Sequence, residues 1–369
     1  YNIELPVTLL PAEFVGGEPG EFTPIQFGTK NQMGAGATLR QLIFDGTYIV
    51  GLKGAKVYNQ LVAQQKGATV FEVKKNTSDA YYVAVVAVEN HKMLVDNLTE
   101  IEKQLFETTK LYENGLVEEN NVDQLRLNSG KIRIEVENAA RQMIISRNML
   151  KFQMGIVLRD SLVLTDDIQQ LIENATAEIA GRYVYDVSQN IQFQVANAWV
   201  DVREMQVRLE KAKYLPSLSA LLNVTGTSYA EAFDYFNGDN WFASSFLGVN
   251  MKVPIFSGMQ RHSSLQRAKI NSLITQVERE RMQENLNLNL STSNANFNQA
   301  LAAFNISMEN VEVSRKILRT TNRKFQEGMA TSFEVTQAQS QLINDQFSLV
   351  GSALNLFEAK TQIDEILNN

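Results

Sequence analysis

The residue types that most often carry catalysis are sparse in this sequence. Its 369 residues include no cysteine and only two histidines, His91 and His262, which lie far apart along the chain. Disulfides, thiolate metal sites, a cysteine nucleophile and a histidine-rich metal cluster are therefore excluded. His91 is in line with Leu98 and Leu105 on one face of an expected helix, which indicates a packed histidine rather than a ligand.

One glycine-containing segment, residues 51–56 (GLKGAK), superficially resembles a phosphate loop. It lacks the full Walker spacing and the Ser or Thr that should follow the lysine. No Ser/His/Asp arrangement and no pair of carboxylates suited to acid–base catalysis stands out. The sequence therefore predicts a protein that is not an enzyme and has no cofactor and no metal.

Charge and hydropathy limit the possible partners. The formal net charge is −7, and acidic and basic residues are spread along the chain, so no nucleic-acid partner is expected. The sequence contains no run of roughly 18 consecutive apolar residues, so no transmembrane helix is expected. The sequence opens at Tyr1 inside a patterned segment, so we expect an N-terminal helix and a signal peptide to be missing from this chain.

Heptad repeats predict very long helices. Large residues followed three positions later by small ones suit close helix packing, and one such repeat is clearest in the last third of the chain. Its large members are Leu290, Phe297, Phe304, Val311, Leu318 and Phe325. A second repeat comprises Ala80, Ala87, Leu94, Ile101 and Thr108, and a third comprises Leu342, Leu349, Leu356 and Ile363. We expect further helices over about 121–158 and 168–213.

The chain is predicted to be an internal duplication. Gly46 and Gly258 each follow a strand-exit motif and lie 212 positions apart, and Gly115 and Gly328 each end a long helix and lie 213 positions apart. A register held to one residue over two landmarks indicates two copies of one large unit. The span from Gly46 to Gly115 corresponds to roughly 100 Å of helix.

Four segments alternate apolar and polar residues, which is typical of strands. They begin near residues 3, 33, 217 and 243, and they reach about ten residues, the length that a tilted strand needs to cross a bilayer. Four strands cannot close a barrel alone and an open edge is not tolerated in lipid, so they must pair with other chains. The polar sides would face a watery lumen, lined by Asn223, Thr225, Asn250 and Lys252.

Three motifs carry a resemblance to a known family. The sequence LPSLS (215–219) follows a long helix that ends in Lys-Ala-Lys, IFSG (255–258) closes a strand, and YENGLV (112–117) stands at a hairpin tip. In this order and spacing the chain resembles the TolC outer-membrane efflux family over essentially its whole length. The resemblance implies a fold that is mainly α with transmembrane β, in which duplicated coiled-coil hairpins form a periplasmic tunnel. Four strands per chain then contribute to a trimeric β-barrel of about twelve strands.

The resemblance also implies a domain division. Residues 1–43 and 214–256 would supply the barrel strands and extracellular loops. Residues 44–213 would form the first helical repeat, with a hairpin tip near 113–120 and an equatorial segment near 159–175. Residues 257–369 would form the second repeat, with its tip near 326–332.

The expected partners follow from the same family. The chain would be a homotrimer in outer-membrane lipid, and it would work as the exit duct for a periplasmic adaptor protein and an inner-membrane pump. A drug-efflux pump, a metal exporter and a protein-secretion ATPase stay open as alternatives for that pump. The expected location is the cell outer membrane with a long periplasmic extension.

Two groups of residues are candidate functional sites. Exposed apolar side chains at a tip usually mark a partner surface, and the predicted adaptor-docking set is Gly115, Leu116, Val117, Gly328, Met329 and Ala330. By resemblance, Glu334 matches the position of an acidic residue that rings the pore constriction, with Gln337 one turn further on. Asn121 matches a polar residue that ties the two hairpins together, although its usual basic partner is replaced by Ala330.

A soluble coiled-coil scaffold is the alternative function. It would explain the heptads but not the alternating strands and the aromatic residues between them.

Overall fold

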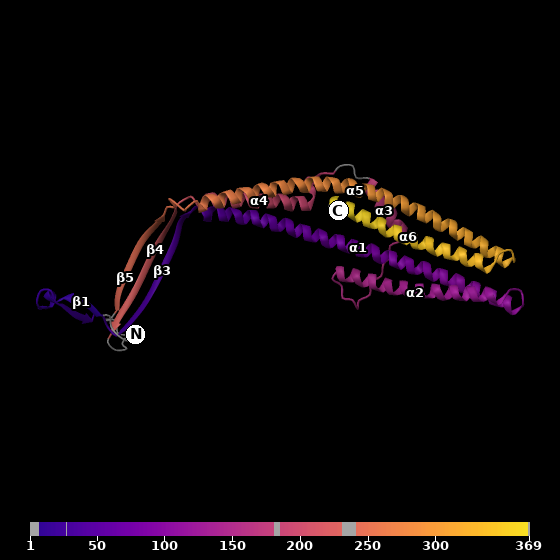
Figure 1. Cartoon of the computed structure of the whole chain (residues 1–369), viewed down its shortest axis with the longest axis horizontal. Coiled ribbons are helices and arrows are strands. Elements are labelled where there is room, and N and C mark those ends of the chain that lie inside the picture. The colour runs from indigo at the N-terminus through magenta and orange to yellow at the C-terminus, as the bar shows by residue number, and fades with distance from the viewer. Residues whose placement is uncertain (1–6, 27, 181–184, 231–240, 368–369) are drawn as a thin grey trace. The chain divides into compact units, whose positions relative to one another are not determined.

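The computed structural model describes residues 7–26, 28–180, 185–230 and 241–367. It divides into two compact units, one formed by residues 1–58 and 201–273 and the other by residues 59–200 and 274–369. Each unit is described by itself. The first contains the sheets and the helix ends that adjoin them, and the second contains the helical hairpins (Figure 1).

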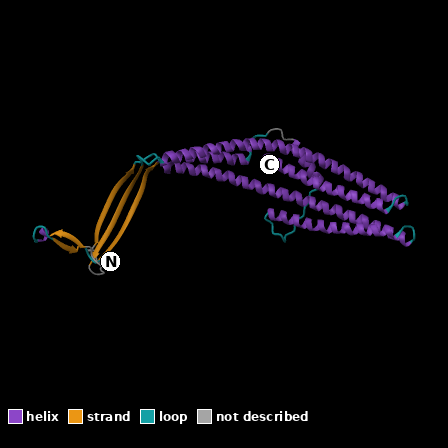
Figure 2. Ribbon diagram, in the orientation of Figure 1, coloured by secondary structure: helices purple, strands orange, loops and turns teal. Residues whose placement is uncertain are grey.

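The described residues of the first unit form two separate sheets (Figure 2). Strand β1 (Val7–Pro11) pairs with β2 (Phe22–Gln26) in a short antiparallel hairpin, with a 3₁₀ turn at Ala12–Val15. Three longer strands form the second sheet in the order β3-β4-β5, all antiparallel. They are β3 (Asn31–Asp45), β4 (Ser217–Ala230) and β5 (Trp241–Lys252).

Three of the four expected long strands therefore lie in one sheet. The fourth was expected from Asn2 to Leu9, and most of it lies outside the described residues. Its described end, in β1, pairs with β2 rather than with the long strands. The aromatic segment expected between β4 and β5 also falls mainly outside the described residues, which include Tyr229 on β4 and Phe242 on β5.

A β-bulge lies at the end of β3, directly before the first long helix, α1 (Gly46–Glu113). The pairing shifts between Leu42 and Phe44, so Ile43 has no partner on β4 and Asp45 pairs with Ser217. The Asp45 carboxylate then accepts hydrogen bonds from the backbone N–H of Thr47 (2.7 Å) and of Tyr48 (3.2 Å). These bonds satisfy N–H groups that the first turn of a helix leaves unpaired.

The two landmark glycines at the strand exits serve different purposes. A Cβ on Gly46 would lie 2.6 Å from Leu215 Cδ1 and 3.2 Å from both Ala212 O and Leu215 Cβ, so a larger residue there would crowd the end of α4 (Ile191–Ala212). Gly258 instead has φ of 55°, a left-handed turn that glycine adopts without strain.

The helices reproduce the predicted duplication closely. Helix α1 (Gly46–Glu113) has 68 residues and α5 (Gln260–Gln326) has 67, and each is followed by a shorter antiparallel helix. Those are α2 (Glu119–Gln153), with 35 residues, and α6 (Ser332–Leu367), with 36. Figure 1 shows the two resulting hairpins, α1–α2 and α5–α6.

The heptad seams form the core of these hairpins. Phe297, Phe304, Val311, Leu318 and Phe325 are all buried, and Leu290 is half-buried. One cluster joins Phe297 and Phe304 of α5 to Leu356 and Phe357 of α6, and another joins Ile101 of α1 to Leu125 and Ile132 of α2. His91, which was expected to be packed in line with Leu98 and Leu105, is half-buried.

The prediction of a single helix over 168–213 is wrong. The structure has α3 (Ile168–Ala180), a 3₁₀ turn at Val187–Gln189 and α4 (Ile191–Ala212). The reason is a second helix start at Asn190, whose side-chain oxygen accepts from the N–H groups of Gln192 (2.9 Å) and Phe193 (3.2 Å). Helix α2 also ends at Gln153, five residues earlier than expected.

Candidate functional site

Both hairpin tips end their long helix in the same way. At the first tip, Gly115 has φ of 74°, its N–H bonds to Tyr112 O (2.8 Å) and the N–H of Leu116 bonds to Leu111 O (2.9 Å). At the second tip, Gly328 has φ of 73°, with matching bonds to Phe325 O (3.0 Å) and from Met329 to Lys324 O (2.7 Å). This is the Schellman arrangement, which needs a left-handed residue just past the helix end.

The apolar side chains at the tips are unequally exposed. Leu116 is 69% exposed and Met329 is 66% exposed, so each tip presents one large apolar residue. Val117 and Ala330 are half-buried, contrary to the expectation that all four would be exposed. Phe333, in the first turn of α6 and 65% exposed, adds an aromatic surface at the second tip that the sequence analysis did not single out.

Glu334 forms a capping box at the start of α6. Its carboxylate accepts hydrogen bonds from the backbone N–H (2.7 Å) and the hydroxyl (3.1 Å) of Thr331, and its own N–H donates to the Thr331 hydroxyl (3.2 Å). The backbone bond first, and then the hydroxyl bond, hold the pKa of Glu334 below its ordinary value. Gln337 is exposed one turn further along the same helix.

Asn121 connects the two hairpins, but through a different residue from the one expected. The Ser332 hydroxyl at the start of α6 lies 2.5 Å from Asn121 Oδ1 and 2.9 Å from Gln124 Oε1, both on α2. A hydroxyl has one proton, so it donates to one of these amides and accepts from the NH₂ of the other. The link between hairpins is therefore neutral, and it bypasses Ala330.

Further amides continue this polar contact along the hairpins. Asn97 Nδ2 of α1 donates to Gln346 Oε1 of α6 (2.5 Å), and Gln104 Nε2 of α1 donates to Asn322 Oδ1 of α5 (3.2 Å). Gln339 of α6 is buried, and its side-chain amide has no hydrogen-bond partner among the described residues. A buried amide left unpaired costs about 1–3 kcal/mol.

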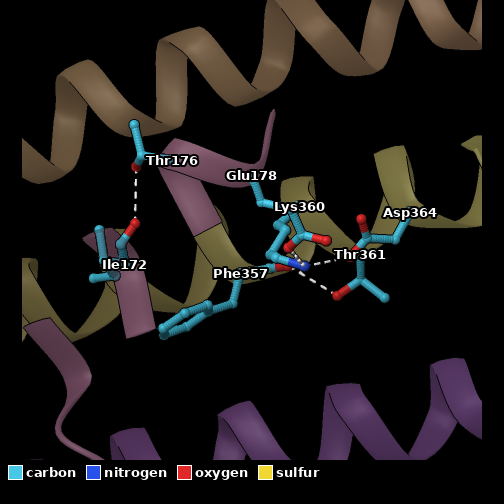
Figure 3. Close-up of polar contacts among 7 residues, drawn as sticks. All are labelled: Ile172, Thr176, Glu178, Phe357, Lys360, Thr361 and Asp364. Atoms are coloured by element: carbon cyan, nitrogen blue, oxygen red, sulfur yellow. Dashed lines mark hydrogen bonds and ion pairs between the residues drawn. The ribbon is translucent and has the colours of Figure 1, made fainter. Parts of the chain in front are cut away.

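A charged cluster joins α3 to α6 (Figure 3). The buried ammonium group of Lys360 lies 2.5 Å from Asp364 Oδ2 and 3.2 Å from Glu178 Oε2. Burial alone would lower the pKa of Lys360, but the bond to Asp364 and the charges around it raise the pKa above its ordinary value. Nearby, the Tyr82 ring stacks on Phe357 with 4.3 Å between centroids. The cluster joins α6 to the C-terminal part of α3, a helix that only overlaps the expected equatorial segment near 159–175.

The sheet register brings the predicted lumen residues to one face. Asn223 pairs with Phe246 and Thr225 with Ser244, while Asn250 and Lys252 pair with Ser219 and Ser217. Asn223 Nδ2 also donates to Thr38 Oγ1 of β3 (2.8 Å), which places Thr38 on the same face. The opposite face carries the apolar residues Leu222, Val224, Leu247, Val249 and Met251, all exposed on the chain itself.

No helix in the described part of the chain is long and apolar enough to cross a membrane.

A comparison with curated proteins finds no match to the sequence. Solved structures do match. The outer membrane protein VceC of Vibrio cholerae aligns with a TM-score of 0.69 and 14% identity, covering 92% of this chain and 87% of its own.

Two other channels give similar values. CusC, described in relation to transmembrane channel formation, has a TM-score of 0.74 and 13% identity, over 98% of this chain and 81% of its own. The outer membrane channel CmeC of Campylobacter jejuni has a TM-score of 0.73 and 14% identity, over 98% of this chain and 75% of its own. At this level of identity the likeness establishes a shared fold.

A family model decides the affiliation. The model of the outer membrane efflux proteins matches residues 187–369, which include α4, β4, β5, α5 and α6. This chain belongs to the outer membrane efflux protein family. The family name places the protein in the outer membrane, and it refers to efflux rather than to a catalysed reaction. The duplication extends the same architecture to the first half of the chain, where α1 and α2 repeat α5 and α6.

Proposed function

We propose that this outer membrane efflux protein is one protomer of a homotrimeric channel. It would be the exit duct of a tripartite efflux or secretion system, in which it passively conducts small molecules or proteins received from a periplasmic adaptor and an inner-membrane pump. The sheet β3-β4-β5 carries this proposal.

The strands have membrane-spanning length and open edges. They contain 15, 14 and 12 residues, whereas about 9–11 are enough to cross a bilayer with tilt. Among the described residues, the outer edges of β3 and β5 have no strand partner. Because unpaired backbone groups are not tolerated in lipid, other copies of the chain must cover these edges.

The two open edges belong to different strands, which favours a ring. A contact between unlike surfaces repeats head to tail and closes when the rotation allows it. With four strands from each chain, three copies would give a barrel of about twelve strands. The exposed apolar residues Leu116 and Met329 at the hairpin tips would then form the surface for the adaptor.

A pair of neighbouring substitutions on β5 tests the proposal. Val249 is 68% exposed on the apolar face, and Asn250 is the next residue, on the polar face. Val249→Arg would place a cation in lipid, at a cost of about 2–4 kcal/mol near the bilayer midplane. We expect it to reduce the amount of trimer in the outer-membrane fraction strongly. Asn250→Arg should insert normally and shift ion selectivity toward anions in a planar bilayer.

The same arginine is thus compared on opposite faces of one strand. Crosslinking of the extracted protein in mild detergent should give a three-chain ladder for wild type and Asn250→Arg. Equal insertion of both variants, or loss of Asn250→Arg alone, would contradict the assignment of the two faces and with it the barrel.

A further inference from the structure

We propose that the junction between the sheet and the long helices of the first unit contains a binding site for an amphipathic anion. The site is a cavity of about 610 Å³ at the end of β3, β4 and β5, lined also by residues that precede and begin α5. Its volume lies within the roughly 300–1,000 Å³ of small-molecule sites.

Three basic residues and one acidic residue line the cavity: Lys213, Lys252, Arg261 and Asp45. Lys213 is paired with Glu210 (2.6 Å). Lys252 has no ion-pair partner among the described residues. Its row neighbour across β4 is Asp45, but that carboxylate is bonded to the first turn of α1 instead. No ion pair joins Lys252 to Asp45 among the described residues, although both line the cavity, so the Lys252 ammonium group can pair with a ligand.

Arg261 is held in place with donors to spare. One guanidinium nitrogen donates to Pro254 O (3.1 Å), and the group lies over the Tyr214 ring at 5.5 Å from its centroid. Of its five N–H donors, the carbonyl bond uses one. A guanidinium in the first turn of a helix also adds to the positive end of the helix dipole, an arrangement that favours a bound anion.

The two copies of the duplicated unit contribute different side chains at the helix starts beside this cavity. The landmark glycines align Asp45 with Ser257 and Ile49 with Arg261. The first junction thus has an acid that caps its helix and an apolar residue in the first turn. The second junction lacks both. The first turn of α5 has no acidic residue, and Arg261 stands where the first junction has Ile49. The same backbone has acquired two more units of positive charge.

Much of the rest of the cavity wall is apolar, which indicates that the ligand has an apolar part. Leu215, Val253, Ile255 and Phe256 line it, and they are between 50% and 92% exposed. Cations beside uncovered apolar side chains suit a ligand with one acidic group and an apolar body. Met259, at the edge of this segment, is the one non-glycine residue with positive φ (65°) among those described, and such strain tends to occur at functional sites.

The test uses the trimer in nanodiscs and naphthalene-2-sulfonate as the probe. Titration followed by the probe's fluorescence anisotropy should show saturable binding. Lys252→Gln and Arg261→Gln should each weaken it about tenfold, because a charge-assisted hydrogen bond is lost. Naphthalene-2-sulfonamide, which has the same body without the charge, should bind about tenfold more weakly than the sulfonate.

Arg40→Gln is the matched control. Arg40 is the counterpart of Lys252 in the first repeat and lies on the same sheet without lining the cavity. No saturable binding, an equal loss in Arg40→Gln, or equal affinity for the sulfonamide would overturn the site. Should Arg261→Gln assemble poorly, Lys252→Gln decides. Unchanged channel conductance alongside absent probe binding would reject the site and leave the channel function standing.

Competition identifies the source of the natural ligand. Displacement of the probe by dihexanoyl phosphatidylglycerol assigns the site to a lipid headgroup, and failure to displace it assigns the site to a soluble amphipathic anion.

Discussion

Phe304→Ala is the most direct test of the packing that holds the two hairpin helices α5 and α6 together. Phe304 is 6% exposed and belongs to the cluster that joins α5 to Leu356 and Phe357 of α6. The substitution removes the ring, and it does not lower the helix propensity because alanine is the best helix former. Any loss of stability therefore reports the packing.

The expected magnitude follows from the burial. A phenylalanine buries roughly 150 Å² or more, and at about 25 cal/mol per Å² this corresponds to about 4 kcal/mol. Measured Phe→Ala changes in protein cores, which also include the cavity left behind, are about 3–5 kcal/mol. Ala300 and Ala353 beside the ring are small and cannot fill the space, so we expect a value in this range.

The assay is urea unfolding of the detergent-solubilised protein, followed by the helical signal in circular dichroism. Asn305→Ala is the control, because Asn305 is the next residue on α5 and is exposed. It should change the free energy of unfolding by no more than about 0.5 kcal/mol. If Phe304→Ala is no more destabilising than the control, the heptad seam does not hold the hairpin.

The remaining predictions concern the second hairpin tip. Glu334→Ala should speed amide hydrogen exchange in the first turn of α6, whereas Glu334→Gln keeps an acceptor and should change it less. Since capping lowers the pKa of Glu334, its contribution should be complete above the ordinary value of 4.5 and lost as the pH falls through the lower folded pKa. In a planar bilayer, Glu334→Gln should weaken cation preference and block by divalent ions. Unchanged selectivity and block would mean that the carboxylate serves only as a cap. Ser332→Ala removes the link to Asn121 and should speed exchange at the start of α2 about tenfold; no change there would show that the link carries no stability.

The long helices could be predicted because their pattern is local and repeated. Every large member of the α5 heptad from Phe297 to Phe325 is buried, and the glycines that end α1 and α5 have nearly equal φ. A period sustained over many turns leaves one face for the core, so sequence alone specifies both the helix and its buried side.

The segment between α3 and α4 was not predicted, although a signal was present. The apolar period continues across it, which suggested one helix over 168–213. Asp186 and Asn190 are both residues that favour helix starts, and Asn190 also donates to Ile366 O (2.9 Å) from α6. That contact joins residues 176 positions apart, and periodicity along one segment cannot reveal it.

The candidate site was predictable only in part. The motif Thr331-Ser332-Phe333-Glu334 has the Thr-x-x-Glu pattern of a capping box, so the bonds of Glu334 could have been read from the sequence. The partner of Asn121 could not. It depends on the register between α2 and α6, where Ile343 of α6 packs against the cluster that contains Leu125 and Ile132 of α2.

The two tips also differ in a way that bears on any partner. The landmark glycines align Asn121 with Glu334 and Glu118 with Thr331. At the second tip the helix caps itself, whereas Glu118 at the first tip makes no side-chain cap and Asn121 bonds to the other hairpin. The duplication has therefore kept the backbone turn and changed what stabilises the helix after it. In a trimer, six similar tips would alternate between a self-capped carboxylate and an amide held by its neighbour. The backbone of these tips would then have nearly sixfold symmetry, whereas their charge and stability would have only threefold symmetry.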